Sequence, residues 1–195
     1  MKLSKLTPSI AGVLLACVCL PVSAQPKAPA QQLLAAQSSI GFIARQMGVP
    51  IEGHFKKFDG QISFDATKPA SSKVAFTVDI ASATLGTPET DAELPKSDWF
   101  NTAKFPQASF ASAAVKPLGS GKYEVAGKLT IKGQTRDVVV PVTMTQTGTV
   151  TLAVGVLPIK RLAFKIGENE WADTSMVADD VQIKFKIALS GAGKL

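Results

Sequence analysis

The sequence predicts an all-β protein, an eight-stranded antiparallel up-and-down β-barrel with a short helix after the third strand. Two observations predict this fold. Apolar and polar residues alternate along most of the chain after Ser38, and short turn signals separate the alternating segments. Strands joined by short turns pair as antiparallel hairpins, and closing the sheet into a barrel removes its exposed edges.

Residues 1–24 have the features of a secretory signal peptide. Two lysines near the start precede an almost unbroken apolar run over residues 10–20, and small residues at 22–24 offer a cleavage site. The apolar run is too short to be a membrane span. We therefore expect the protein to be secreted, with cleavage after Ala24.

Both cysteines, Cys17 and Cys19, lie within this leader. Residues 14–17 resemble a bacterial lipobox, so a lipid anchor on Cys17 is the alternative to cleavage after Ala24. Without the leader no thiol remains, and we expect no disulfide, no cysteine-ligated metal and no cysteine nucleophile. Residues 25–37 predict a flexible tether with a short helical end, and residues 38–195 predict one barrel domain.

The charge pattern argues against nucleic-acid binding. The chain has 21 basic and 15 acidic residues, a net charge of +6, but the basic residues are spread along the predicted strands and turns without a cluster. Among possible partners, a slightly basic surface fits transient contact with anionic lipid better than nucleic acid, but an ordinary solvated face is the preferred interpretation.

The eight predicted strands cover residues 39–46, 53–65, 72–81, 108–117, 122–132, 135–147, 149–160 and 180–190. The alternation is clear in the third strand, where Val74, Phe76, Val78 and Ile80 share one face, and in the last, where Val181, Ile183, Phe185 and Ile187 do. The turn signals between strands include Asp59-Gly60, Gly119-Ser120-Gly121, Lys132-Gly133-Gln134 and Thr147-Gly148.

Two segments interrupt the strand pattern. Residues 89–100 begin with three acidic residues and contain apolar positions, which predicts a short helix or a pair of turns that restarts at Pro95. Residues 161–180 form a long connection around Trp171, and loops of that length in compact domains are usually functional.

The barrel interior could be hollow or filled. Small residues such as Ala108 and Ala153 fall at interior positions, which favours space along the axis but also fits the taper of a packed core. The segment 97–112 contains Trp99 and three of the ten phenylalanines. Its rings either line a mouth or plug one end of the barrel.

Three stretches carry a resemblance to a known family. They are "GHFKKFDGQISFD" (53–65), "TDAELPKSDWFNTAKFPQASFAS" (90–112) and "GKLTIKGQTRDVVVPV" (127–142). The chain resembles the YceI-like proteins, which are lipocalin-like barrels of the bacterial periplasm that bind polyisoprenoid lipids. It departs from the family pattern at Leu34 and Gln37, where an acid and a histidine are common. It also departs at Gln46, where a basic residue or a histidine is common, and at Pro95, where the family residue is usually basic.

The resemblance implies a non-catalytic carrier with an isoprenoid chain, such as a quinone tail or a polyprenyl phosphate, inside the barrel and no other cofactor. The expected ligand-binding residues are Phe42, Phe58, Phe64, Phe76, Trp99, Phe100, Phe110, Leu129, Ile131, Arg161, Phe164 and Trp171. Arg161 is the candidate for a phosphate head group, and Arg45 and Lys160 also fall near predicted strand ends. A fatty acid or amide ligand is one alternative, and a filled barrel acting as a stress-related interaction module is another.

The sequence lacks a recognisable catalytic or metal-binding constellation. His54 is the only histidine, and it falls one position from an apolar strand residue, so we expect it to face outward. Acidic residues are concentrated between 168 and 180. They could form a weak calcium site, or they could be ordinary turn-forming acids. Their spacing matches no calcium loop. We expect no enzyme activity and no metal.

Overall fold

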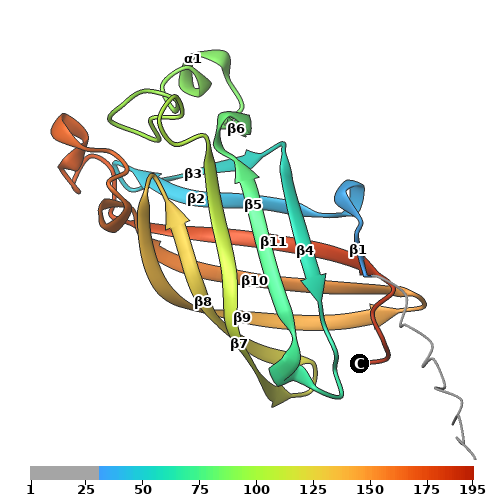
Figure 1. Cartoon of the computed structure of the whole chain (residues 1–195). Coiled ribbons are helices and arrows are strands. Elements are labelled where there is room, and N and C mark those ends of the chain that lie inside the picture. Colours follow the sequence, from blue (N-terminus) through green and yellow to red (C-terminus); the bar gives the residue numbers. More distant parts are fainter. Residues whose placement is uncertain (1–30) are drawn as a thin grey trace, which may run out of the picture.

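In a computed structural model, which describes residues 31–195, the chain forms one curled antiparallel sheet of eleven strands (Figure 1). The strands are β1 (Gln32–Leu33), β2 (Ser39–Gln46), β3 (Val49–Phe55), β4 (Phe58–Ser63), β5 (Lys73–Asp79), β6 (Ala83–Thr84), β7 (Gln107–Gly119), β8 (Lys122–Ile131), β9 (Gln134–Thr147), β10 (Val150–Lys160) and β11 (Asp180–Ser190). The helical segments are η1 (Ala35–Gln37), η2 (Pro69–Ser71), η3 (Ile80–Ser82), α1 (Pro88–Asp91), η4 (Arg161–Phe164) and η5 (Asn169–Ala172).

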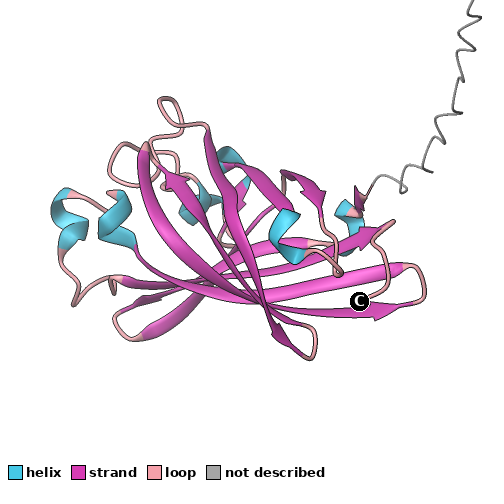
Figure 2. Cartoon of the chain, turned by 60° about the horizontal axis from the view of Figure 1, so that its bottom comes forward, coloured by secondary structure: helices cyan, strands magenta, loops and turns pink. Residues whose placement is uncertain are grey.

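The strand order is β4-β5-β7-β8-β9-β10-β11-β2-β3-β6, with β1 paired to β11 outside this path. Every recorded pairing is antiparallel, and the chain returns to its beginning where Phe185 of β11 pairs with Ile40 of β2. Figure 1 shows the result: β4, β5, β7 and β8 form a front layer that crosses β2, β3, β10 and β11 behind it, and the turned view of Figure 2 shows that two groups of strands cross. The predicted all-β antiparallel sheet is confirmed, but the predicted eight-stranded barrel is not, because the sheet has eleven strands and its two end strands, β4 and β6, do not pair in the part of the chain that the structure describes.

The predicted strand 53–65 divides into β3 and β4. β3 pairs with β2, whereas β4 pairs with β5, and no pairing joins the two within residues 31–195. At the break, the amide of Lys56 donates to the carbonyl of Ser82 (3.1 Å) and that of Lys57 to its hydroxyl (3.0 Å). The hydrogen-bonded ladder is therefore open here, and Asp59-Gly60 lies within β4 rather than in a turn.

Residues 31–37 are part of the fold rather than the expected flexible tether. β1 pairs with the last residues of β11. The side chain of Gln31 forms two hydrogen bonds with the backbone of Phe64: its Nε2 donates to the Phe64 carbonyl, and its Oε1 accepts from the Phe64 amide (2.8 Å). η1 supplies the expected short helical end. Residues 25–30 and the predicted leader, including Cys17, lie outside the described residues.

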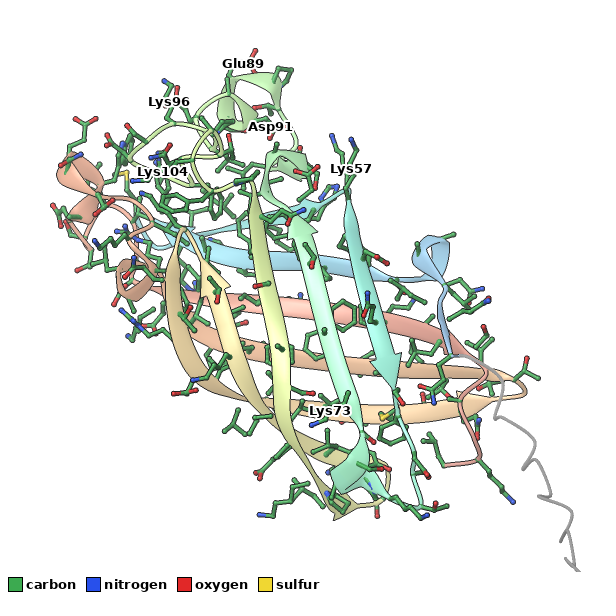
Figure 3. All side chains as sticks on the ribbon, in the orientation of Figure 1. Lys57, Lys73, Glu89, Asp91, Lys96 and Lys104 are labelled. Carbon is green, nitrogen blue, oxygen red and sulfur yellow. The ribbon has the colours of Figure 1, made fainter. Side chains whose placement is uncertain are left out.

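The two interrupting segments meet at one end of the sheet. The predicted helix over 89–100 is reduced to the four residues of α1, and turns continue to Phe100. The connection 161–179 contains η4 and η5, and the amide of Gly167 donates to the carbonyl of Asp98 (2.8 Å). Figure 3 shows Glu89, Asp91, Lys96 and Lys104 at this end, with Lys73 away from it toward the other end of β5.

The apolar core lies between the two layers. Its main cluster includes Tyr123, Leu129, Met144 and Phe164, and a second cluster of Ile40, Ile187 and Leu189 lies near β1. Among residues 31–195, none of the helices has the length and apolar character needed to cross a membrane.

Candidate functional site

A cavity of about 410 Å³ lies inside the curled sheet. Because side chains alternate across a strand, every second residue of each long strand faces it. Its strand residues include Ile40, Phe42 and Ala44 (β2), Ile51 and Phe55 (β3), Ile62 (β4), Val74, Phe76 and Val78 (β5), Ala108, Phe110 and Val115 (β7), Tyr123, Val125, Leu129 and Ile131 (β8), Val140, Val142 and Met144 (β9), Ala153, Leu157 and Ile159 (β10), and Val181, Ile183, Phe185, Ile187 and Leu189 (β11). The wall is almost entirely apolar, and the interior is hollow rather than filled.

Ten of the twelve residues expected to contact a ligand line this cavity. They are Phe42, Phe64, Phe76, Trp99, Phe100, Phe110, Leu129, Ile131, Arg161 and Trp171. The other two do not. Phe58 packs against the second core cluster near Ile40, and Phe164 of η4 is buried in the main core.

Sequence reasoning missed most of the aliphatic wall. Ile62, Val78, Val125 and Ile183 line the cavity together with the aromatic residues. The alternation that predicts the strands also identifies these positions. The aromatic residues alone are therefore an incomplete guide to the wall.

The mouth of the cavity is marked by exposed residues from two neighbouring segments, which are Arg45, Gln46, Thr90 and Glu93. Arg45 and Gln46 end β2, whereas Thr90 and Glu93 belong to α1 and the turn after it. The Arg45 guanidinium makes one long hydrogen bond, from Nη1 to the carbonyl of Gly48 (3.3 Å). The remaining N–H donors of the Arg45 guanidinium therefore have no recorded acceptor within residues 31–195.

Arg161 lies in the cavity wall, but all the hydrogen-bond donors of its guanidinium already have partners. Its side chain donates five hydrogen bonds to backbone carbonyls, those of Ala178 (3.1 Å), Ile166 (2.9 Å), Gly167 (2.7 Å), Trp171 (2.6 Å) and Val177 (2.7 Å). A guanidinium has five N–H donors, so none remains for a phosphate. These contacts argue against the expected head-group role of Arg161, because its side chain organises the connection 161–179.

Burial lowers the pKa of Arg161, and the nearby Asp179 carboxylate opposes that shift. The residue is only 2% exposed. An arginine stays protonated in proteins, so the carbonyl dipoles around it stabilise a buried positive charge.

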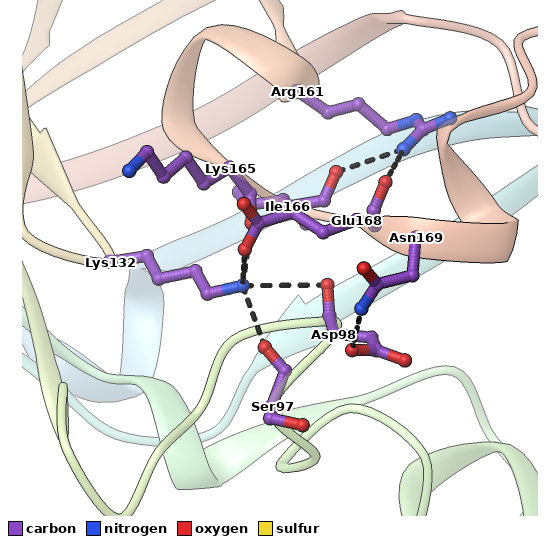
Figure 4. Close-up of polar contacts among 9 residues, drawn as sticks. Ser97, Asp98, Lys132, Arg161, Lys165, Ile166, Glu168 and Asn169 are labelled. Atoms are coloured by element: carbon purple, nitrogen blue, oxygen red, sulfur yellow. Dashed lines mark hydrogen bonds and ion pairs between the residues drawn. The ribbon is translucent and has the colours of Figure 1, made fainter.

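Lys132 joins the two segments that cover this end (Figure 4). It is 5% exposed, and its Nζ donates to the carbonyls of Ser97 (2.8 Å) and Lys165 (2.6 Å) and to Glu168 Oε2 (2.9 Å). Asn169 Nδ2 adds a hydrogen bond to Asp98 Oδ1 (2.7 Å). The segment after α1 and the connection 161–179 are thus held together by a buried charge.

The chain's two tryptophans meet across these segments. The rings of Trp99 and Trp171 have centroids 5.3 Å apart, and both line the cavity. Trp99 belongs to the segment after α1, and Trp171 belongs to the connection 161–179. The rings therefore form part of the cover over the cavity and also part of its wall.

Asp91 fastens α1 to β6. Its carboxylate accepts hydrogen bonds from the Thr84 hydroxyl (2.5 Å) and the Leu85 amide (2.6 Å). These bonds, the one from Thr84 first, hold the pKa of Asp91 below its usual range. The second acidic residue of the predicted helix, Asp91, is thus an anchor for the rim of the cavity.

Several acidic residues in the connection and at the start of β11 have separate partners. Glu168 pairs with Lys132, Asp179 accepts from the Leu162 amide (3.0 Å), and Asp180 pairs with Lys160 (2.8 Å). No group of three or more potential metal ligands occurs within residues 31–195. His54 is exposed on β3, opposite Gly41, and takes no part in the cavity wall.

The family follows from a match that spans the described fold. The family model of the YceI-like domain matches residues 32–189. The chain belongs to the YceI-like family. Its relatives include UPF0312 proteins of Photorhabdus laumondii, 44% identical over 101 residues (51% of this chain and 52% of that one), and of Vibrio cholerae, 37% identical over 106 residues (54% and 56%). The chain spans about half the length of the curated relatives it matches.

Solved structures share this architecture. BcnA of Burkholderia cenocepacia is 47% identical, with a TM-score of 0.79 over 80% of this chain and 99% of that one. A polyisoprenoid binding domain from Saccharophagus degradans is 16% identical, with a TM-score of 0.67 over 83% and 98%. The second match is a likeness of fold alone. One structural relative is thus a lipid-binding domain of the same fold.

Proposed function

We propose that this YceI-like protein binds one polyisoprenoid or similar long-chain amphiphile inside its cavity and carries or sequesters it in the periplasm. The observation that carries the proposal is the hollow apolar interior of about 410 Å³. The lipid-binding relative from Saccharophagus degradans supports the choice of ligand class. The proposal assigns no catalytic role to any residue.

The energetics of such a complex are favourable. Each buried CH₂ contributes about 0.8 kcal/mol, so ten buried carbons contribute about 8 kcal/mol before ordering costs. Those costs reduce the net affinity, but several kcal/mol remain. A hydrocarbon chain in water has no better environment apart from a membrane.

The polar head of the ligand would lie at the mouth, near Arg45 and Gln46. Arg45 has free donors that could bind a phosphate or a carboxylate. Gln46 occupies a position where the family often has a basic residue, so we infer that this member recognises a different head group. That difference favours a fatty acid or amide as the second candidate ligand.

Transient contact with a membrane would load the cavity. Beside the mouth, Met47 is 71% exposed, Val49 is 62% exposed and Met176 is 41% exposed. The amide of Met47 donates to the carbonyl of Met176 (2.8 Å), so these two residues are neighbours beside the mouth. Export by the predicted signal peptide would bring the protein to the compartment where such lipids are exchanged.

Native mass spectrometry of protein purified without detergent tests the function. We expect a one-to-one complex, and extraction with organic solvent should release an isoprenoid or, under the second candidate, a fatty acid or amide. An apo mass alone, with no extractable lipid and no uptake of added lipid, would contradict both candidates.

A matched pair of variants sharpens this test. Ala153 lines the cavity, whereas its neighbour Val154 lies on the outer face. Ala153→Phe should fill the lumen and purify without lipid, while Val154→Phe should keep it. If both variants retain the same lipid, the ligand does not occupy this cavity.

A further inference from the structure

Strand glycines of the inner face lie beneath phenylalanine rings. Gly53 of β3 is the cross-strand partner of Phe42 of β2, and Gly60 of β4 is the partner of Phe76 of β5. Both rings line the cavity. The two pairs lie on opposite sides of the break between β3 and β4, so the same arrangement recurs in two separate ladders.

The rings occupy the space that a side chain would need. A Cβ atom at Gly53 would lie 2.3 Å from Cζ of Phe42, and one at Gly60 would lie 2.4 Å from Cε1 of Phe76. Ordinary contacts of a Cβ atom begin at 3.4 Å, so each ring approaches about 1 Å closer than any other residue permits. For both glycines, the three nearest atoms all belong to the phenylalanine ring.

Two further glycines show the same contact less cleanly. Ring atoms of Phe110 lie 2.8 Å from a Cβ built at Gly127, and those of Phe185 lie 2.4 Å from one at Gly155. In both cases a backbone carbonyl is also closer than 3 Å. Gly53 and Gly60 are therefore the positions where the effect of the ring can be isolated.

The arrangement has a direct consequence for the width of the cavity. Glycine within a strand weakens the strand, and it often marks a place where another group approaches closely. Here the approaching group is a ring that lies against the wall instead of projecting into the lumen. A methyl group at either glycine would push the ring away from the wall, toward the cavity axis.

We propose that Gly53 and Gly60 determine ligand specificity by setting the width of the cavity. By letting Phe42 and Phe76 lie against the wall, they leave room for a methyl-branched chain and not only for a linear one. This inference rests on the proposed function, because it concerns the chain that the same cavity accepts. It adds that two backbone positions, rather than the aromatic residues alone, select that chain.

Binding of two chains of equal main-chain length tests the proposal. Geranylgeraniol and 1-hexadecanol both have a main chain of sixteen carbons, but only the first carries methyl branches. Titrations followed by tryptophan fluorescence should show that Gly53→Ala and Gly60→Ala weaken geranylgeraniol binding about tenfold more than hexadecanol binding. Equal weakening of both chains, or none, would overturn the proposal.

Gly41→Ala is the matched control. Gly41 of β2 adjoins the same ladder, and a Cβ there would lie 2.7 Å from the carbonyl of Gly53, but on the face opposite the cavity. This variant should lose stability without changing the preference between the two chains. A second variant, Gly53→Ala combined with Phe42→Leu, removes the displaced ring and should restore geranylgeraniol binding.

Proton NMR of the unliganded protein separates this proposal from the proposed function. A ring lying over glycine shifts the Hα signals of Gly53 and Gly60 upfield, and Phe42→Leu should remove the shift at Gly53 only. If the shifts are present but neither chain binds, the proposed function fails while the ring geometry stands. If the shifts are absent, the proposal about Gly53 and Gly60 fails whatever the protein binds.

Discussion

Arg161 illustrates how a single residue can hold a long connection in place. Its five hydrogen bonds reach carbonyls spread from Ile166 to Ala178. Since the connection has little regular secondary structure, these carbonyls have few other donors. The guanidinium thus takes the place of a strand partner for a segment that has none.

We expect Arg161→Lys to destabilise the protein strongly. An ammonium has three donors and lacks the planar fork, so at least two buried carbonyls lose their partner, at about 1–3 kcal/mol each. The free energy of unfolding, measured with urea, should fall by about 3 kcal/mol. Arg136→Lys is the control, because Arg136 is exposed and also donates to a backbone carbonyl, that of Ala163 (2.9 Å); an equal loss there would contradict the role of Arg161.

Asp91 makes the rim of the cavity sensitive to acid. Because the pKa of Asp91 is lowered in the folded state, its stabilising effect is complete above the usual pKa of an aspartate and is lost as the pH falls through the lowered value. The protection factors of the amides in residues 85–92, which are the exchange rates corrected for the pH dependence of intrinsic exchange, should therefore fall on acidification. Thr84→Val removes the main cause of the shift, so this loss of protection should then begin at higher pH.

At the scale of elements, the turn between β8 and β9 is unusual. Lys132 and Gly133 both have positive φ values, +47° and +72°, as a two-residue hairpin turn requires. Asparagine or glycine is the usual choice at the first position. Lysine is found here because its side chain leaves the turn and reaches the carbonyls of Ser97 and Lys165.

We expect Lys132→Asn to favour the turn but release the two covering segments. Asparagine tolerates the backbone conformation and is too short to reach the carbonyls, so the unfolding free energy should fall by about 2 kcal/mol. Hydrogen exchange should increase at residues 97–101 and 165–168. Ser120→Asn provides the control, because Ser120 has a φ of +51° in another hairpin and its side chain makes no recorded hydrogen bond within residues 31–195. A comparable increase in exchange in both variants would argue against the role of Lys132 in holding the two covering segments together.

At the scale of the whole molecule, the cavity links ligand binding to stability. A ligand at one hundred times its dissociation constant stabilises the folded state by about 2.7 kcal/mol, which corresponds to a rise in Tm of about 5–10 °C. We expect geranylgeraniol added to solvent-extracted protein to raise the Tm by this amount. It should also change the fluorescence of Trp99 and Trp171, which line the cavity.

Ala153→Phe serves as the negative control for this measurement, because its ring would occupy the lumen. The variant should show neither the rise in Tm nor the fluorescence change. A rise of the same size in the variant would mean that the lipid binds outside the cavity.

The strand pattern made much of the molecule predictable. A period of two residues assigns each side chain to one face of a strand, so the inward faces of β5, β8 and β11 could be assigned from local sequence. The family resemblance suggested the ligand class that we propose. Local patterns also located the two interrupting segments and the turns at Gly121, Gly133 and Gly148.

Other features depend on residues far apart in the chain, and only the tertiary structure decided them. Three such features join segments that no local pattern relates. They are the change of strand partner between β3 and β4 at Lys56 and Lys57, the carbonyls around Arg161, and the contacts of Lys132 with Ser97 and Lys165. Whether the interior is hollow was decided in the same way, because a ring can lie against the wall only where the neighbouring strand presents a glycine. Alternation fixes which way a side chain points, but the space left between opposing walls depends on how the whole sheet curls.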